Sequence, residues 1–257
     1  MNRQAQGVVL LLLGGAVVKA SVTDMYLRYV KEGLRPFLII AGLLLVAAAV
    51  MTLFYDLRRR PAPASGGTAG DGPVDPGSAG DDHGHDHGGR GHHEPRVGWL
   101  LILPVLGLLL VAPPALGSYA AGQAGTALSS QQVSDYPPLP DGDPAKVSVL
   151  DYASRAIFDK GASLGQRRVQ LTGFVATGPD GQPMLARIIL SCCAADGRPI
   201  KVGLDGNAPG GLAPDTWVEV IGAYTDRTGT DPVNGEGIPY LKVETWREIE
   251  PPKQQYE

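Results

Sequence analysis

Histidine is missing from most of this sequence: all five histidines fall between residues 83 and 93, and none follows them. This absence excludes most histidine-dependent catalysis from the C-terminal part, including a Cys–His nucleophile pair. Cysteine is also scarce, because Cys192 and Cys193 are the only two and are adjacent. Such a pair cannot form the disulfide scaffold of a small secreted domain.

The sequence has no excess of basic residues and few aromatic ones. It contains 22 Lys and Arg against 26 Asp and Glu, and only 6% of its residues are aromatic. Residues 145–257 are also mildly acidic, with 12 basic and 14 acidic side chains. Single-stranded nucleic-acid sites need a positive groove and exposed aromatic rings for stacking. We therefore expect no nucleic-acid partner.

Charge is nearly absent from residues 34–55, where Arg35 at the edge is the only charged side chain. At about 1.5 Å per residue these residues span roughly 33 Å, enough to cross a hydrocarbon core of about 30 Å. They predict a transmembrane helix. Residues 97–119 predict another, with Trp99 and Tyr119 suited to the two interfaces and Pro113-Pro114 able to end it early. A buried core helix is the alternative for this segment.

Residues 7–18 form a shorter apolar stretch that allows two interpretations. Twelve residues suit the core of a cleaved signal peptide, with Arg3 as its basic flank. A retained helix reaching about Val30, with Lys19 extending toward the interface, is the interpretation we favour. The sequence thus predicts two or three membrane helices, the first ones within residues 1–56.

Basic residues near the ends of the helices predict the orientation. Arg58-Arg59-Arg60 follow the second predicted helix, and no Lys or Arg lies between Tyr119 and Lys146. Arg28, Lys31 and Arg35 oppose this bias. We expect a multi-pass protein of the plasma membrane, with residues 57–96 in the cytoplasm and the C-terminal domain outside.

Two segments have the composition of linkers. Residues 57–96 hold ten glycines and five prolines with almost no apolar side chain, so we expect disorder. Residues 120–146 are milder and include a proline-rich stretch typical of an extended tether. The first linker carries a set of imidazoles that can bind zinc or another transition metal weakly: His83, His85, His87, His92 and His93. An incidental, solvated spacer is the alternative.

Residues 147–257 have the pattern of a mainly-β domain that begins with a short helix. Ser148 and Asp151 resemble a capping box, and Gly161 is a natural helix stop. Alternation then predicts five strands. They lie at residues 169–175, 184–193, 200–204, 216–224 and 240–249.

Glycines inside two of these strands favour a closed barrel. Gly173 and Gly222 each follow alternating apolar residues, and such glycines often mark the bulges or bends that a small barrel needs. Five strands with glycines in the first and fourth resemble an OB (oligonucleotide/oligosaccharide-binding) barrel. An open β-sandwich is the alternative.

Cys192 and Cys193 are the most distinctive residues of the domain. On a strand their side chains point to opposite faces, so that one thiol packs inward while the other faces a groove. A reactive thiolate needs a basic neighbour, which Arg187 or Arg198 can supply. Small residues at a strand end, a vicinal disulfide, and a metal–thiolate contact with Asp196 remain alternatives.

Ser191-Cys192-Cys193-Ala194-Ala195-Asp196, together with the apolar stretch at 99–117, the histidine-rich loop and Tyr256-Glu257, resembles the YcgQ-like family of predicted bacterial membrane proteins, in its actinobacterial form. The resemblance implies association with a multi-spanning permease and a link to zinc homeostasis. It marks Cys192, Cys193 and Asp196 as motif positions of unestablished role and supplies no catalytic residues.

We therefore expect a non-enzymatic membrane protein that assists a permease, possessing two or three helices and an OB-like domain. The histidine loop would collect zinc or another transition metal on the cytoplasmic side. Two other functions stay open. One is an envelope scaffold or sensor without metal, and the other is a thiol-dependent envelope enzyme that uses Cys192 and Cys193.

Overall fold

A computed structural model of the chain describes residues 3–58, 106–107, 110, 114–128 and 136–257. The chain divides into two compact units, one formed by residues 1–17 with 40–112 and the other by residues 18–39 with 113–257. The five histidines lie outside the described residues, so the predicted metal-collecting loop stays a prediction.

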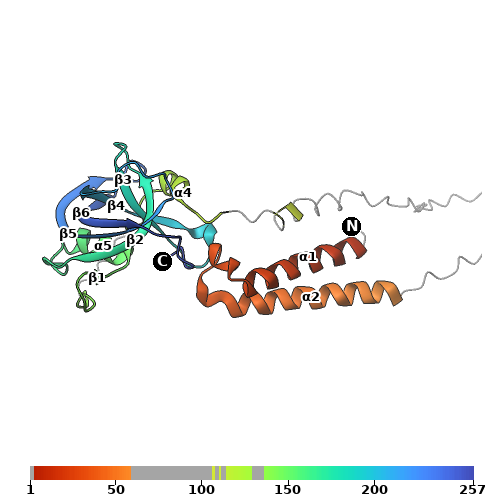
Figure 1. Ribbon diagram of the computed structural model, residues 1–257. Helices are drawn as coiled ribbons and strands as arrows, with labels where there is room; N and C mark the ends of the chain where they lie inside the picture. Colours follow the sequence, from red (N-terminus) through yellow and green to blue (C-terminus); the bar gives the residue numbers. More distant parts are fainter. Residues whose placement is uncertain (1–2, 59–105, 108–109, 111–113, 129–135) are drawn as a thin grey trace, which may run out of the picture. The chain divides into compact units, whose positions relative to one another are not determined.

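Two N-terminal helices, α1 (Arg3–Val22) and α2 (Arg35–Arg58), lie side by side (Figure 1). Glycine allows their close approach, because a Cβ at Gly14 would lie only 2.9 Å from the carbonyl oxygen of Gly42. Among the described residues, one helix is long and apolar enough to cross a membrane, and it covers Glu32–Arg58. Its large apolar side chains are mostly exposed, as lipid-facing ones are. The apolar part of α1, Gln6–Val22, is shorter.

The connection between these helices contains two short 3₁₀ helices, η1 (Met25–Arg28) and η2 (Glu32–Leu34). Tyr26 of η1 is buried, at 3% exposure. The guanidinium of Arg35 lies 5.8 Å from the centre of its ring. A short polar connection thus has an ordered conformation of its own, and it belongs to the unit that contains the C-terminal domain.

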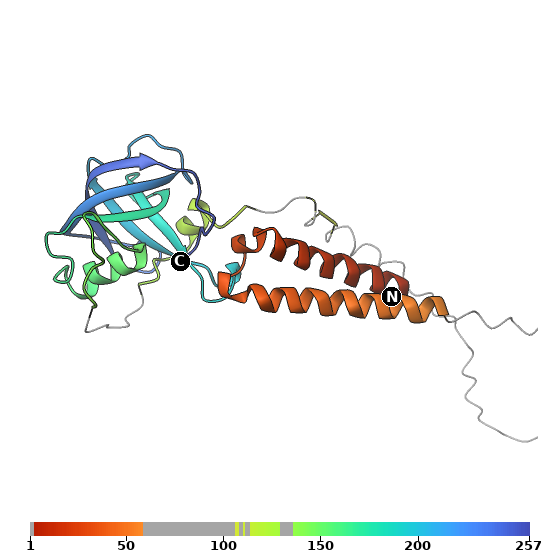
Figure 2. The same cartoon turned by 60° about the horizontal axis from the view of Figure 1, so that its bottom comes forward.

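The C-terminal domain is a closed barrel of five strands, as the sequence predicts (Figures 1 and 2). They are β2 (Val169–Thr177), β3 (Pro183–Ile189), β4 (Arg198–Gly206), β5 (Trp217–Thr230) and β6 (Gly237–Glu248). Their order is β2-β3-β4-β6-β5, and β5 pairs back to β2. Only β4 and β6 run parallel among these neighbours. The closure excludes the open sandwich.

Glycine allows a close approach of neighbouring strands at both predicted positions, and one of the two lies at a register shift. The register between β5 and β6 shifts at Ile221/Gly222, and a Cβ at Gly222 would lie 2.3 Å from the carbonyl oxygen of Lys242. A Cβ at Gly173 would lie 2.6 Å from the carbonyl oxygen of Ala186. A side chain at either position would push neighbouring strands apart, which is why these strands need glycine.

Inward-facing aliphatic residues fill the barrel. The fully buried ones include Leu171, Leu185, Ile200, Val202, Val218, Val220 and Leu241. Helix α5 (Val149–Phe158) covers one end of the barrel and contacts four of its strands (Figure 2). Ser148 caps this helix as predicted, because its hydroxyl accepts the N–H of Asp151 at 3.0 Å. The helix buries Tyr152 and Ala153 against the core.

The segment ahead of the domain differs from the predicted tether. Residues 118–123 form a short helix, α4 (Ser118–Gln123), which contacts β2, β3 and β4. Ala121, Ala127, Leu128 and Leu139 are buried, and β1 (Ala145–Lys146) pairs with β2 in parallel. These side chains belong to the hydrophobic clusters of the barrel, so much of the predicted linker belongs to the domain.

The predicted helix at residues 97–119 lies mostly outside the described residues. Leu106, Gly107 and Leu110 are helical, whereas residues 114–117 are not. A continuous helix to Tyr119 is therefore wrong. Whether this segment crosses a membrane stays a prediction.

Candidate metal centre

The two cysteines lie in a tight loop after β3, and the prediction of a strand through Cys193 is wrong. The strand ends at Ile189, and the 3₁₀ helix η4 (Ala194–Asp196) follows the cysteines. The Asp196 carboxylate accepts the backbone N–H groups of Ser191 at 2.9 Å and Cys192 at 2.8 Å. These N–H groups are satisfied by a side chain instead of a neighbouring strand, so the chain turns back.

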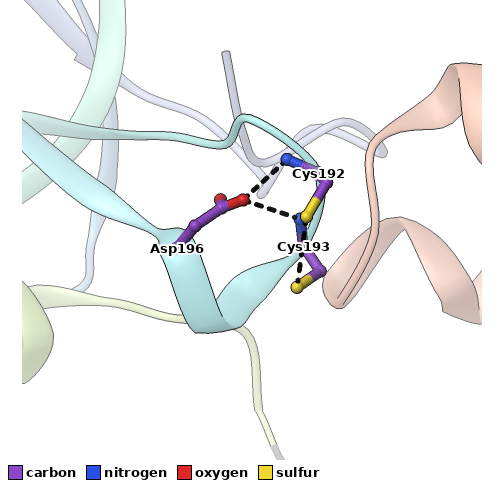
Figure 3. Close-up of side chains that lie close together, drawn as sticks. All are labelled: Cys192, Cys193 and Asp196. Atoms are coloured by element: carbon purple, nitrogen blue, oxygen red, sulfur yellow. Dashed lines mark hydrogen bonds between the residues drawn. The ribbon is translucent and has the colours of Figure 1, made fainter.

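This loop brings three metal-ligating side chains together (Figure 3). The Sγ atoms of Cys192 and Cys193 are 3.6 Å apart, and they lie with a carboxylate oxygen of Asp196 within 4.8 Å of one another. Cys192 is exposed, and Cys193 is half-buried. Because the two sulfur atoms are 3.6 Å apart, the thiols do not point to opposite faces as predicted.

The charges of the loop oppose a free thiolate. Hydrogen bonding to Asp196 and to Cys193 raises the pKa of Cys192 to about 11. Hydrogen bonds from Cys192, both its side chain and its N–H, lower the pKa of Asp196 to about 2. At neutral pH the loop therefore carries a carboxylate beside a protonated thiol. A cation that binds there gains the carboxylate at once and must displace the thiol protons.

The connection between α1 and α2 holds the loop in place. The N–H of Ala194 donates to the carbonyl oxygen of Tyr29 at 2.7 Å, and the N–H of Lys31 donates to that of Cys192 at 3.1 Å. Val30 and Cys193 form an antiparallel bridge. These bonds hold Cys192, Cys193 and Ala194 in place through main-chain atoms of the loop.

Tyr256 ties a third segment to the same region. Its hydroxyl donates to the carbonyl oxygen of Arg28 and accepts the N–H of Leu116, each at 2.8 Å. Its backbone forms a parallel bridge with Ile188 at the end of β3. The N–H of Glu257 also donates to the carbonyl oxygen of Ile188 at 2.9 Å. Segments far apart in the sequence therefore meet beside the cysteine loop.

Neither predicted basic neighbour activates the cysteines. The guanidinium of Arg187 donates to the carbonyl oxygen of Gln254 at 2.8 Å and lies 4.8 Å from the ring centre of Trp217. Burial lowers the pKa of Arg187. Arg198 is the first residue of β4. The pKa of Cys192 rises, whereas a nucleophilic cysteine needs a lowered one.

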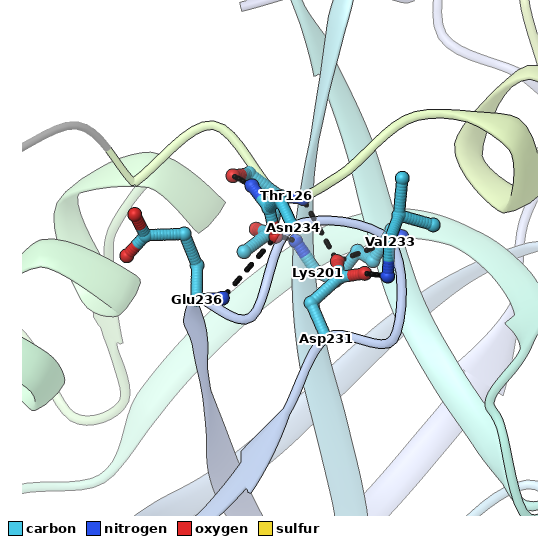
Figure 4. Close-up of polar contacts among 6 residues, drawn as sticks. All are labelled: Thr126, Lys201, Asp231, Val233, Asn234 and Glu236. Carbon is cyan, nitrogen blue, oxygen red and sulfur yellow. Dashed lines mark hydrogen bonds and ion pairs between the residues drawn. The ribbon is translucent and has the colours of Figure 1, made fainter.

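Sequence reasoning missed a second polar cluster, around Asp231 (Figure 4). Lys201 Nζ lies 2.9 Å from Asp231 Oδ2, and the Asp231 side chain is fully buried. The N–H of Thr126 donates to the same oxygen at 2.8 Å, and the N–H of Lys201 donates to Thr126 Oγ1 at 3.2 Å. The Asn234 amide donates to the carbonyl oxygen of Thr126 at 3.0 Å.

These bonds give the Asp231 cluster a structural role. Both of its charges are paired, and its hydrogen bonds fasten Thr126 to β4 and to the loop between β5 and β6. The Asp231-Pro232 turn was visible in the sequence, but no pattern in it pairs Asp231 with Lys201, which is thirty positions earlier. A paired, buried lysine offers no charge for a ligand.

Of the residues predicted to carry function, the structure unites Cys192, Cys193 and Asp196 in one loop. No match to the chain is found among curated proteins or among solved structures. Residues 155–257 match the DUF1980 C-terminal domain, which is consistent with the resemblance to the YcgQ-like family. The barrel and its cysteine loop lie within the part of the chain that is similar to this domain, whose family is uncharacterised.

Proposed function

We propose that this protein is a membrane-anchored accessory of a permease and that it binds zinc, or a metal of similar chemistry, at Cys192, Cys193 and Asp196. One observation carries the proposal: the three ligating atoms lie within 4.8 Å of one another on a loop whose outer thiol is exposed. Thiolates favour zinc and copper(I), and a carboxylate completes zinc sites in many proteins.

The spacing of the thiols suits a tetrahedral metal. With Zn–S bonds of about 2.3 Å, two thiolates around a tetrahedral zinc lie about 3.8 Å apart. Cys192 and Cys193 already have their sulfur atoms 3.6 Å apart. The backbone would need little change on binding, because bonds from Tyr29, Lys31 and Asp196 hold the loop.

Three protein ligands leave one position of a tetrahedral zinc open. Structural zinc sites are closed by four protein ligands, whereas a site with an open position exchanges its fourth ligand. An exposed site of this kind suits the transfer of a metal to or from a partner. A permease that moves the metal is the partner implied by the resemblance to the YcgQ-like family.

The contacts of the cysteine loop support an orientation for the chain. The loop binds residues 29–31, which connect α1 and α2. If both helices cross the membrane, this connection and the C-terminal domain lie on the same side. Arg58-Arg59-Arg60 then follow α2 on the opposite side, and we assign that side to the cytoplasm by the positive-inside rule, although Arg28, Lys31 and Arg35 in the connection oppose it. We therefore propose a multi-pass protein of the plasma membrane with an extracytoplasmic barrel.

The histidine linker has a separate place in this proposal. His83, His85, His87, His92 and His93 follow α2 in the sequence and would be cytoplasmic. Imidazoles on a glycine-rich chain bind zinc weakly, because binding must order the chain. The linker would collect metal on one side of the membrane, and the cysteine loop would bind it on the other.

Zinc titration of the full-length protein in detergent tests the proposal. Two variants are compared. The first has all five histidines replaced by Asn, and the second has Cys192→Ser and Cys193→Ser in addition. With the histidines replaced, we expect one tight zinc per chain, which a competing chelator can quantify. The cysteine changes should remove it, and Ser191→Ala should keep it. Unchanged tight binding in the double serine variant would overturn the proposal.

A further inference from the structure

The two thiols of the cysteine loop are close enough to react with each other. Their sulfur atoms are 3.6 Å apart, against about 2.05 Å in a disulfide. Rotation of the two side chains can close this gap, because Cys192 is exposed and its thiol is hydrogen-bonded to Asp196 and to Cys193 itself. The N–H of Asp196 donates to the Cys193 side chain in a capping box, whereas the bonds that join the loop to Tyr29 and Lys31 use backbone atoms.

We infer that Cys192 and Cys193 form a reversible vicinal disulfide in the metal-free protein, so that oxidation by a small-molecule or protein disulfide closes the metal site. The metal part of this inference rests on the proposed function. Zinc binds thiolates, and a disulfide has none to offer. Bound metal and the disulfide therefore exclude each other.

The reaction balances as an ordinary thiol–disulfide exchange. The thiolate of Cys192, which is the exposed cysteine, attacks one sulfur of the oxidant disulfide. The other half of the oxidant leaves as the first free thiol. The thiolate of Cys193 then attacks the Cys192 sulfur, and the half of the oxidant attached to Cys192 leaves as the second free thiol. Each cysteine loses one proton, the pair loses two electrons, and both electrons and both protons end on the two departing thiols.

Adjacent cysteines make this disulfide easy to reduce. Their Cα atoms are about 3.8 Å apart because one peptide bond joins them. Unstrained disulfides have Cα atoms about 4.4–6.8 Å apart. A strained and exposed disulfide has a more oxidising potential, which is the property of regulatory disulfides rather than structural ones. The site would thus respond to the redox state of its surroundings.

The test uses the full-length protein in detergent, with the five histidines replaced by Asn and the metal removed. The protein is equilibrated with glutathione and oxidised glutathione at a series of ratios under anaerobic conditions. We expect both thiols to disappear together, with a mass decrease of two hydrogens and no glutathione attached. Zinc binding should fall at least tenfold and return after reduction.

Controls separate this inference from the proposed function. Cys193→Ser should hold one glutathione on Cys192, because the second exchange step is missing, and Ser191→Ala should behave as the parent. Stable glutathione on both cysteines of the parent, or cross-linked dimers, would overturn the inference. If the vicinal disulfide forms but the reduced protein binds no zinc, the exchange chemistry stands and the proposed function fails.

Discussion

At the residue scale, Asp196 has two roles in the cysteine loop. It shapes the loop by accepting backbone N–H groups, and it keeps the nearby thiol protonated. The same carboxylate that makes the Cys192 thiol a poor nucleophile makes the site attractive to a cation. This combination favours metal binding over nucleophilic catalysis, which needs a thiolate at neutral pH.

Replacing this carboxylate should therefore make Cys192 more reactive. Its pKa is raised to about 11, chiefly by Asp196, so the thiolate is scarce below that pH. In a Cys193→Ser background, Asp196→Asn should lower the pKa of Cys192 and speed its alkylation at pH 8. We expect about a threefold faster rate for each unit by which the pKa falls, because the larger fraction of thiolate outweighs its lower nucleophilicity. Alkylation rates followed by mass spectrometry check this, and equal rates would contradict it.

Asp231 provides a prediction about stability. Its partner Lys201 is buried, so Asp231→Asn leaves an ammonium group without a countercharge and should cost about 3–5 kcal/mol. Thermal unfolding of the full chain in detergent measures the loss. Lys201→Met combined with Asp231→Asn should recover most of it. A double variant no more stable than the single one would show that the charge pair is not the cause.

The pH dependence of stability follows from the same residue. Burial raises the pKa of Asp231, but hydrogen bonds from Lys201, Val233 and Thr126 outweigh it and lower the pKa overall. A lowered pKa in the folded state stabilises the protein above the ordinary range near pH 4, and this stabilisation is lost as the pH falls through the lowered value. The parent should lose stability there more steeply than Asp231→Asn. Identical pH profiles would contradict the argument.

At the scale of elements, Tyr256 links three segments through one hydroxyl group. Tyr256→Phe removes the acceptor for the Leu116 N–H and the donor to the Arg28 carbonyl oxygen. Loss of these partly buried bonds should cost about 1–3 kcal/mol. Hydrogen exchange at Leu116 should become faster, while exchange within β4 should not change. Unchanged protection of Leu116 would show that the hydroxyl does not hold this segment.

The elements that sequence predicts best are those with a strong local pattern. Alternation and internal glycines predicted the five-stranded barrel, because Leu171 and Val220 face the core and Gly222 relieves a close approach between strands. Ser148 predicted the start of α5 through its capping hydroxyl. Each of these signals lies within a few residues of the feature it specifies.

The elements that the sequence does not predict depend on partners far away along the chain. The apolar run before Cys192 looks like a continuing strand, but the Asp196 carboxylate takes the backbone N–H groups and turns the chain. Residues 120–128 look like part of a tether, yet Thr126 binds Asp231 more than a hundred positions away. Secondary-structure propensities and hydrophobic periodicity contain no information about which distant residues will pair.

At the scale of the whole molecule, the orientation proposed from the cysteine loop can be tested directly. A membrane-impermeant maleimide should label Cys192 in intact cells under reducing conditions, because the proposed topology puts the barrel outside. Arg60→Cys in a background with both native cysteines changed to Ser should be labelled only after permeabilisation. Labelling of Cys192 only after permeabilisation would reverse the topology.

X-ray absorption at the zinc edge observes the atoms around a bound zinc and tests directly whether Cys192, Cys193 and Asp196 hold the metal. The sample is the full-length protein with its five histidines replaced by Asn and one zinc bound per chain. The account predicts two sulfur atoms at about 2.3 Å from zinc, with oxygen completing the shell. A shell of oxygen and nitrogen alone would contradict it.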